Sequence, residues 1–329
     1  MKTTTNIIGI VATSLIAFGC ARVNSESSET LKLEVPLQDY GYEYLRLYPV
    51  LANDVFINHR KSTGHYVTLS EAVRENKVVV SEHVAEEPSG SAEDAEGENF
   101  DGPIVNTLFI ENVSADTVLI LGGEIVNGGN QDRMIAMDVI IPPNSGKMDL
   151  SVFCVEKGRW EGNQVFFTVG TLSLPPSGVR SEAHALNEQQ IVWDKVDMKM
   201  AEMDMQSPTG AIADLMADHD HQKELDAYSS NLTKVFDGRE NVVGVIAVVG
   251  DKIIGCDIFA THKLLDVYFP NLLQSYSSEA VSIEETPTLE PARINEYLQE
   301  VTIRAKADGF LRSETRVAER KLPPHFSMF

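Results

Sequence analysis

The chain has 329 residues, of which 43% are hydrophobic, and a formal net charge of -22 at pH 7. A chain of this length and composition is expected to fold into a globular protein with a sizeable core. The strong negative charge opposes binding to nucleic acid and to anionic lipid headgroups, and we exclude nucleic acid as a partner.

The first 20 residues predict export and lipid attachment. Lys2 supplies a positive charge, and residues 7–18 form an apolar stretch too short to span a bilayer comfortably. Cys20 follows Ala-Phe-Gly, which is similar to the lipobox where bacteria attach diacylglycerol to a cysteine and cleave before it. We expect residues 1–19 to be a lipoprotein signal peptide and residues 20–32 to be a flexible tether. The lipidated cysteine then holds the protein at the cell envelope, on the periplasmic or cell-surface side. An ordinary signal peptide or an uncleaved anchor is the alternative.

The segment that follows predicts a strand, a short helix and a second strand. Residues 44–56 are rich in apolar side chains and are typical of a strand that enters the core. The sequence Thr-Leu-Ser-Glu at 68–71 has the form of a capping box, which favours a helix through Arg74. The run Lys-Val-Val-Val at 77–80 is typical of a strand. Residues 86–99 are acidic and contain no bulky apolar side chain, so we expect a disordered loop there.

A series of short strands then predicts an antiparallel β-meander. The connections at 127–130 (Asn-Gly-Gly-Asn) and 142–146 (Pro-Pro-Asn-Ser-Gly) carry residues that favour tight turns. Strands joined by such short turns pair in the antiparallel direction. The expected strands are residues 104–110, 117–121, 124–126, 131–141, 149–156 and 165–169.

After Pro175 the apolar spacing changes to that of helices, with one hairpin among them. Gly250-Asp251 is a dipeptide typical of hairpin turns. Because the strands are grouped before the helices, the sequence predicts an α+β fold, in which a C-terminal helical and hairpin portion packs on a sandwich-like antiparallel meander. We expect residues 33–329 to form one domain. The expected helices are residues 181–200, 207–232, 261–272 and 294–307, with Pro270 as a point where the third can break, and the hairpin strands are residues 242–249 and 253–259.

The first hairpin of the meander is predicted to pair a glutamate with an arginine. If the glycines at 128–129 form the turn, antiparallel pairing sets Val126 opposite Gln131. By the same count, Glu124 lies opposite Arg133. Residues two positions apart on a strand share a face of the sheet, so Gln131 and Arg133 are expected to point the same way.

The next hairpin extends this row to a second carboxylate. With residues 142–147 as its loop, Cys154 lies opposite Ile135 and Glu156 opposite Arg133. The sequence therefore predicts that Arg133 lies between Glu124 and Glu156, on three adjacent strands and on one face.

This predicted face grades from apolar to polar side chains, as the wall of a binding pocket does. One interpretation is that Arg133, with Arg159, grips a phosphate or carboxylate, while Glu124 or Glu156 binds a hydroxyl or moves a proton. The alternative is a structural ion triad that fixes the register of the sheet. The candidate ligand-binding residues are Gln131, Arg133, Glu124, Glu156, Arg159 and Trp160.

Two cysteines, Cys154 and Cys256, follow Cys20 in the chain. Both lie in apolar, strand-like runs, where buried free thiols are common. An oxidising compartment also permits a disulfide between them. Cys154 is a weak candidate for a nucleophile, with Glu124 and Glu156 as the other catalytic candidates, because no histidine is near it in sequence and a neighbouring carboxylate raises the pKa of a thiol.

Several motifs resemble a bacterial domain family that is named for its association with ADP-ribosylglycohydrolases and rhodanese-phosphatases. They are Gly-Gly-Glu at 122–124, Gly-Gly-x-Gln-x-Arg at 128–133, Cys-x-Glu-x-x-Arg-Trp at 154–160, Gln-Ile-Val-Trp at 190–193 and a strand that ends Asp-Ile-Phe at 257–259. The resemblance covers most of the chain after the tether. By association alone, since the family has no established activity, it implies sensing or processing of nucleotides in ADP-ribose metabolism. An exported, lipidated chain departs from that cytosolic setting.

The remaining polar motifs point to no metal and no cofactor. Residues 218–221 (Asp-His-Asp-His) contain metal-ligand types, but successive helical residues point in different directions, so we expect a solvated helix face. The glycines at 122–123 and 128–129 are turn glycines, because no helix follows them as a dinucleotide site requires. Trp193 lies on an apolar helix stripe and is expected in the core.

Three functions remain compatible with the sequence. The first is an envelope-anchored module that binds or senses an anionic small molecule, such as a nucleotide or an ADP-ribose-like compound, through Arg133. The second is a hydrolase of a glycosidic or phosphate ester bond with Glu124 and Glu156 as its carboxylates. The third is a purely structural interaction module. The expected partners are a small molecule and, through the lipid anchor only, the membrane.

Overall fold

The computed structural model describes residues 32–36, 38–83, 106–159, 166–170, 173–185, 188–311 and 322–329. The predicted signal peptide, Cys20, the acidic loop at 86–99 and Trp160 lie outside these residues. Among the helices that are described, none is both long enough and apolar enough to cross a membrane.

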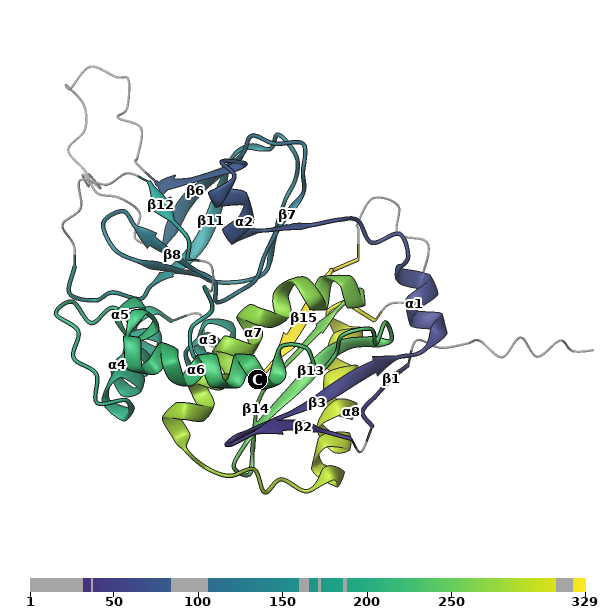
Figure 1. The fold of residues 1–329 in the computed structure, drawn as a ribbon. Coiled ribbons are helices and arrows are strands. Elements are labelled where there is room, and N and C mark those ends of the chain that lie inside the picture. Colours follow the sequence, from purple (N-terminus) through teal and green to yellow (C-terminus); the bar gives the residue numbers. More distant parts are fainter. Residues whose placement is uncertain are drawn as a thin grey trace, which may run out of the picture.

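Of the two main sheets, each of six strands, the larger sheet is the one with more residues in its strands. It joins the N-terminal part of the described chain to its C-terminal part (Figure 1). β13 pairs with β3 on one side and with β14 on the other, and all the pairings in this sheet are antiparallel. Its order is β1 (Leu33–Glu34), β3 (Leu45–Ala52), β13 (Val242–Val249), β14 (Lys252–Phe259) and β15 (His325–Met328), with β2 (Tyr40–Tyr42) also paired to β3.

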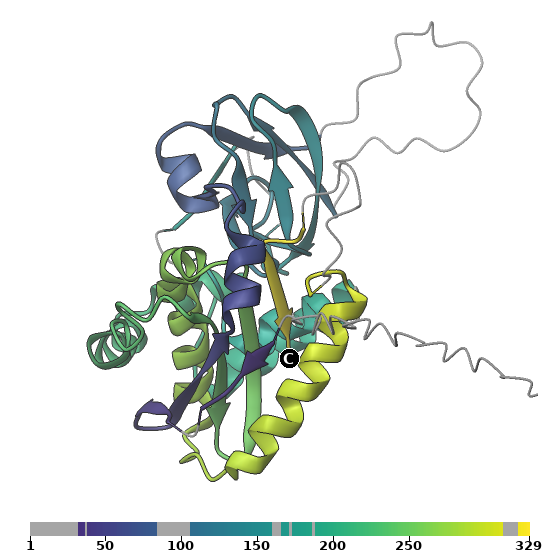
Figure 2. The ribbon, with the colours of Figure 1, turned by 90° about the vertical axis from the view of Figure 1, so that its right-hand side faces the viewer.

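Helices cover both faces of this larger sheet, and in Figure 2 they flank it on opposite sides. Val245 and Ala247 pack with α7 (His262–Ile283), whereas Ile246 and Val248 pack with α8 (Pro291–Ala307). The continuous apolar run of β13 is explained by this burial of both faces. α6 (His219–Leu232) lies beside α7, and α1 (Asp54–Arg60) contributes Phe56 to the core beneath α8.

The second main sheet is the predicted meander, which curls back on itself at the top of Figure 1. An antiparallel bridge between Ser81 and Phe166 brings its two edges together. Its interior is apolar and includes Ile135, Leu150 and Val152. The order of this curled sheet is β12 (Phe167–Thr168), β8 (Ile125–Gly128), β9 (Arg133–Ile135), β11 (Gly146–Cys154), β6 (Thr107–Asn112) and β5 (Val78–Glu82).

Smaller elements complete the fold around the curled sheet. A short sheet of β10 (Val139–Ile141), β7 (Val118–Ile120) and β4 (Val67–Thr68) adds to the same core, as does Leu69 of α2 (Leu69–Arg74). A separate apolar cluster joins the outer face of β9 and β11 to the helices α3 (Ser177–Ala185), α4 (Gln189–Glu202) and α5 (Ile212–Ala217).

The observed architecture confirms the predicted α+β fold and its antiparallel meander. Thr68 caps α2 as expected, since its hydroxyl accepts a hydrogen bond from the backbone N–H of Glu71 at 3.2 Å. α7 runs through Pro270 without ending there.

Two predicted strands are shorter than expected. The predicted strand at 44–56 ends at Ala52, because Asn53 caps α1. The predicted strand at 131–141 divides into β9 and β10, with a break at Ala136–Asp138.

Candidate functional site

The register of the first meander hairpin differs from the prediction by two residues. Val126 pairs with Arg133 and not with Gln131. The Asp132 carboxylate accepts hydrogen bonds from the Gly128 backbone N–H and the Asn127 amide, both at 2.9 Å, and thereby closes a longer turn. Because a shift of two residues keeps each side chain on its face, Arg133 still points into the interior of the curled sheet, on the side of Ile135.

The second predicted pairing is also shifted by two residues. Arg133 lies opposite Cys154, and Ile135 lies opposite Val152. β10 does not pair with β11 as the predicted hairpin requires; it pairs with β7. The predicted triad is therefore wrong, because neither Glu124 nor Glu156 forms an ion pair with Arg133.

Glu124 lies in a separate, fully buried environment. Its carboxylate accepts hydrogen bonds from the Leu121 backbone N–H at 2.8 Å and from the Ser173 hydroxyl at 3.2 Å. Burial raises the pKa of Glu124 to about 7, although these hydrogen bonds oppose the effect. Glu124 thus has a pKa suited to proton transfer but no solvent-accessible surface.

Glu156 belongs to a rim cluster made of Asp132, Glu156, Arg159 and Thr209. Its carboxylate accepts hydrogen bonds from Arg159 Nε at 2.8 Å, Thr209 Oγ1 at 2.9 Å and the Asp132 backbone N–H at 3.0 Å. Burial favours the protonated acid, but these donors outweigh it and lower the pKa of Glu156. Arg159 has 27% of its side chain exposed and also pairs with Asp132 at 3.0 Å, so the rim cluster reaches the surface.

Arg133, Gln131 and Cys154 form an interior cluster behind the rim. The Arg133 guanidinium is fully buried and donates one hydrogen bond of 3.3 Å to Gln131 Oε1, which also accepts from Cys154 Sγ at 2.9 Å. Gln131 Nε2 donates to the Glu156 backbone carbonyl at 2.9 Å, which joins the two clusters.

The Arg133 guanidinium has no ion-pair partner among the described residues, and its Nε has no hydrogen-bond partner. Burial lowers its pKa and the nearby Arg159 cation adds to this effect, while the Glu82 carboxylate, which forms no ion pair with Arg133, acts in the opposite direction. A buried cation without an adjacent counter-charge is costly. The interior cluster therefore lacks a negative charge that compensates the Arg133 guanidinium.

A third polar group, the junction cluster, joins the two main sheets and was not predicted. It consists of Asp138, Arg180, Asp257, Tyr276 and His325. His325 bridges the two aspartates, with Nδ1 at 2.6 Å from Asp138 and Nε2 at 2.9 Å from Asp257. Asp257 also pairs with Arg180 and accepts the Tyr276 hydroxyl. Asp257 interrupts the apolar run of β14, which is the one signal in the sequence that could have indicated this cluster.

The remaining candidates have structural contacts of their own. The Asp218 carboxylate caps α6, and His221 Nε2 lies 2.9 Å from the Ser278 hydroxyl. Within the described ranges, no group of three or more histidine, cysteine or acidic side chains is placed to hold a metal ion. Cys154 and Cys256 are both buried free thiols, so the predicted alternative of a disulfide between them is not formed.

Comparison with known proteins gives one match. No curated protein and no solved structure matches the chain significantly. The family model of the ARG and rhodanese-phosphatase-superfamily-associated protein domain matches residues 35–322. This range includes the curled sheet, the larger sheet apart from its edge strands β1 and β15, and all three polar clusters apart from His325. The chain therefore belongs to this family of uncharacterised domains associated with ADP-ribosylglycohydrolases.

Proposed function

We propose that the protein is an envelope-anchored lipoprotein whose curled sheet binds a small anionic molecule at Arg133. One observation carries the binding proposal: the guanidinium is fully buried, forms no ion pair with a described carboxylate and has an Nε without a partner. A phosphate or carboxylate matches the forked donors of a guanidinium and supplies the missing counter-charge.

The surroundings of Arg133 support a ligand with further polar groups. Gln131 holds one guanidinium nitrogen and a backbone carbonyl, so it orients Arg133 from the side. Arg159 lies at the surface end of the same polar region, where it binds the carbonyls of Gly128 and Gly129 in the β8–β9 turn. The family's association with ADP-ribosylglycohydrolases favours a nucleotide or an ADP-ribose-like compound as the anion.

A thermal-shift panel on the purified full-length protein tests the binding proposal. The probes are ADP-ribose, AMP, inorganic phosphate and citrate. A ligand at about 100 times its Kd adds about 2.7 kcal/mol to the free energy of unfolding, so a rise in melting temperature is expected with at least one probe. We expect Arg133→Met to abolish that rise. Arg74→Met is the matched control, because Arg74 is an exposed arginine on α2 beside the same curled sheet.

Two outcomes overturn the binding proposal. One is the absence of a shift with every probe; the other is a shift that Arg133→Met leaves intact. The first result favours the third hypothesis of a purely structural module, whereas the second shows that the probe binds at a place other than Arg133. Lipid attachment is tested separately by mass spectrometry of the membrane fraction, where Cys20→Ser is expected to remove the acyl-modified N-terminal peptide.

The hydrolase hypothesis has one supporting observation, which is the pKa of about 7 at Glu124. Glu156, the second proposed carboxylate, is held by Arg159 in a different cluster, and its pKa is lowered. Release of phosphate or ribose from any bound probe, lost in Glu124→Gln and retained in Arg133→Met, is the result that establishes this function in place of binding.

A further inference from the structure

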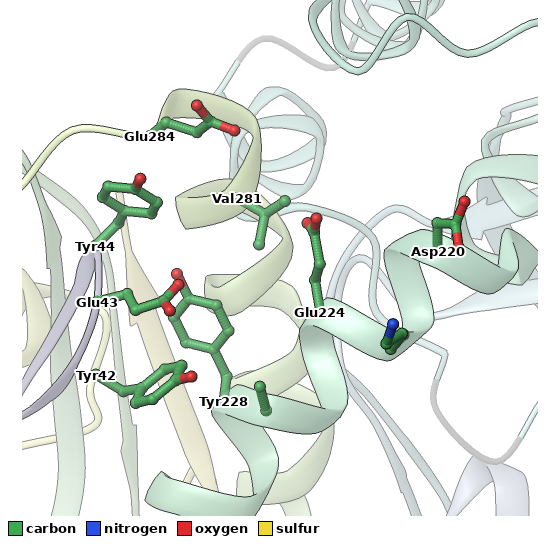
Figure 3. A pocket seen from close by; sticks show the side chains of 10 residues that line it. Tyr42, Glu43, Tyr44, Asp220, Glu224, Tyr228, Val281 and Glu284 are labelled. Atoms are coloured by element: carbon green, nitrogen blue, oxygen red, sulfur yellow. The ribbon is translucent and has the colours of Figure 1, made fainter.

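A second feature is a pocket beside the larger sheet, between the β2–β3 turn and the helices α6 and α7 (Figure 3). The cavity has a volume of about 590 Å³. This volume is within the range of roughly 300–1,000 Å³ that is typical of pockets for small ligands. None of its lining residues belongs to the rim, interior or junction cluster.

Three tyrosines form the inner wall of this pocket. Tyr42 meets Tyr228 edge to face, with ring centroids 5.1 Å apart, and Tyr44 lies above them in Figure 3. Aromatic faces of this kind attract cations through their π electrons. The wall is completed on the α7 side by Val281.

The hydroxyl of Tyr228 has no well-formed hydrogen bond within the described part of the chain. Tyr228 is only 1% exposed, and Figure 3 shows its ring directed toward Glu43 in the pocket. Burial raises the pKa of Tyr228 to about 12, with a small opposing effect from the nearby Tyr44 backbone. A buried hydroxyl without a full partner lacks a hydrogen bond that a polar ligand can supply.

The opening of the pocket is strongly acidic. Glu43, Glu224 and Glu284 surround the opening from three different elements, and none of them forms an ion pair with a described residue (Figure 3). Asp220 adds a fourth carboxylate, and Lys223 is the one basic residue in the lining. The lining charge is therefore three units negative, from four carboxylates and one ammonium group.

The spacing of these carboxylates does not suit a metal ion. Over the described residues, no three acidic, histidine or cysteine side chains are close enough together to ligate one ion. Carboxylates that stand apart around an aromatic floor instead match separate positive groups on one extended molecule. We propose that this pocket binds a small organic cation that carries two or more ammonium groups, as an aliphatic polyamine does.

Isothermal titration of the full-length protein with spermidine tests this proposal. We expect Glu224→Gln to weaken binding about fivefold, because it removes one nearby charge at the protein surface. Lys223→Gln is expected to tighten binding, since it removes the one repulsive charge. Tyr228→Phe is expected to weaken binding while it preserves the aromatic wall.

Matched variants on the same part of the chain separate a site from general attraction to an acidic protein. Asp226→Asn and Lys234→Gln change the same charges at exposed positions on or after α6, outside the pocket lining. Both are expected to leave the Kd for spermidine unchanged. The proposal is overturned if spermidine does not bind, or if Asp226→Asn weakens binding as much as Glu224→Gln does.

Discussion

The Arg180 guanidinium and the Asp257 carboxylate form a doubly hydrogen-bonded ion pair that is completely buried between the two main sheets. The two bonds measure 3.0 and 2.7 Å, and neither side chain has any exposed surface. Arg180 also donates from Nε to the carbonyl of Gly122, in the turn that leads into β8 of the curled sheet, at 2.9 Å. The pair therefore ties α3 and β14 to the meander.

Removal of Arg180 is expected to destabilise the protein strongly. Arg180→Met leaves the Asp257 carboxylate buried without its guanidinium partner, and loss of one partner of a buried pair costs about 3–5 kcal/mol. Urea denaturation followed by circular dichroism measures this loss. A change below about 1 kcal/mol, typical of an exposed pair, contradicts the assigned role of the junction cluster.

The same substitution at Arg133 is expected to have the opposite effect on stability. Arg133 forms no ion pair with a described residue, so Arg133→Met leaves no carboxylate without its partner. Replacing a buried ion pair with apolar side chains of similar size is often neutral or stabilising, by about 1–4 kcal/mol, because it removes the cost of burying charge without leaving an unpaired partner; the same argument applies to a buried arginine that has no paired carboxylate. The unfolding midpoint in urea, measured without ligand, is therefore expected to stay equal or to rise. A loss as large as that of Arg180→Met is the contrary result, and it indicates that Arg133 is a structural cation.

These two arginines mark what the sequence could and could not predict. The interior face of β9 was predictable, because Gln131, Arg133 and Ile135 alternate with outward residues whatever the register. Their partners were not predictable, because a slip of two residues preserves that alternation. The slip comes from the Asp132 side chain, which lengthens the turn through hydrogen bonds that the glycine pattern does not encode.

The junction cluster was beyond sequence reasoning for a different reason. Asp138, Asp257 and His325 are far apart in the chain and meet only because β15 begins where the larger sheet approaches the curled one (Figure 2). Local signals such as the Thr68 cap and the Gly250 turn were sufficient for individual elements. Pairing of β13 with the distant β3 depends on long-range packing, which periodicity does not encode.

Stability is expected to fall as the pH rises above neutrality, because of His325. Burial opposes its protonation, but Asp138 and Asp257 outweigh this effect and raise the pKa to about 9. A pKa that is raised on folding stabilises the protein fully below the unfolded value of about 6.5, and the contribution is lost as the pH rises through about 9. The expected loss is about 3 kcal/mol, since each tenfold change in proton affinity corresponds to about 1.4 kcal/mol. Urea unfolding from pH 6 to 10 measures this loss. His325→Gln is expected to remove the dependence of the free energy of unfolding on pH in this range. If the free energies of unfolding of the parent and the variant change in parallel with pH, the assignment is contradicted.

Glu124 is expected to cause a second loss of stability, which also occurs as the pH rises but over a lower pH range than that of His325. Burial raises its pKa in the folded protein to about 7, so the folded state holds a proton that the unfolded chain releases near pH 4.5. Relative to Glu124→Gln, the free energy of unfolding of the parent protein is expected to fall by about 3 kcal/mol as the pH rises from about 4.5 to about 7. Glu240→Gln, at an exposed position, is the control and is expected to show no such difference. The assignment fails if Glu124→Gln follows the parent at every pH.

Both internal thiols are expected to be protected in the folded protein and free of disulfide. Cys154 lies inside the curled sheet against Gln131, and Cys256 lies in the core beneath α8. Burial raises the pKa of both thiols, which lowers the fraction of reactive thiolate. Alkylation by iodoacetamide is therefore expected to be slow in native buffer and complete in guanidinium chloride, since reaction requires opening of the core.

Mass spectrometry of peptides from non-reduced protein checks whether Cys154 and Cys256 are joined by a disulfide. A peptide pair linked through Cys154 and Cys256 contradicts the separation of the two cores, while rapid native labelling of Cys154 alone shows that solvent reaches the interior cluster without unfolding.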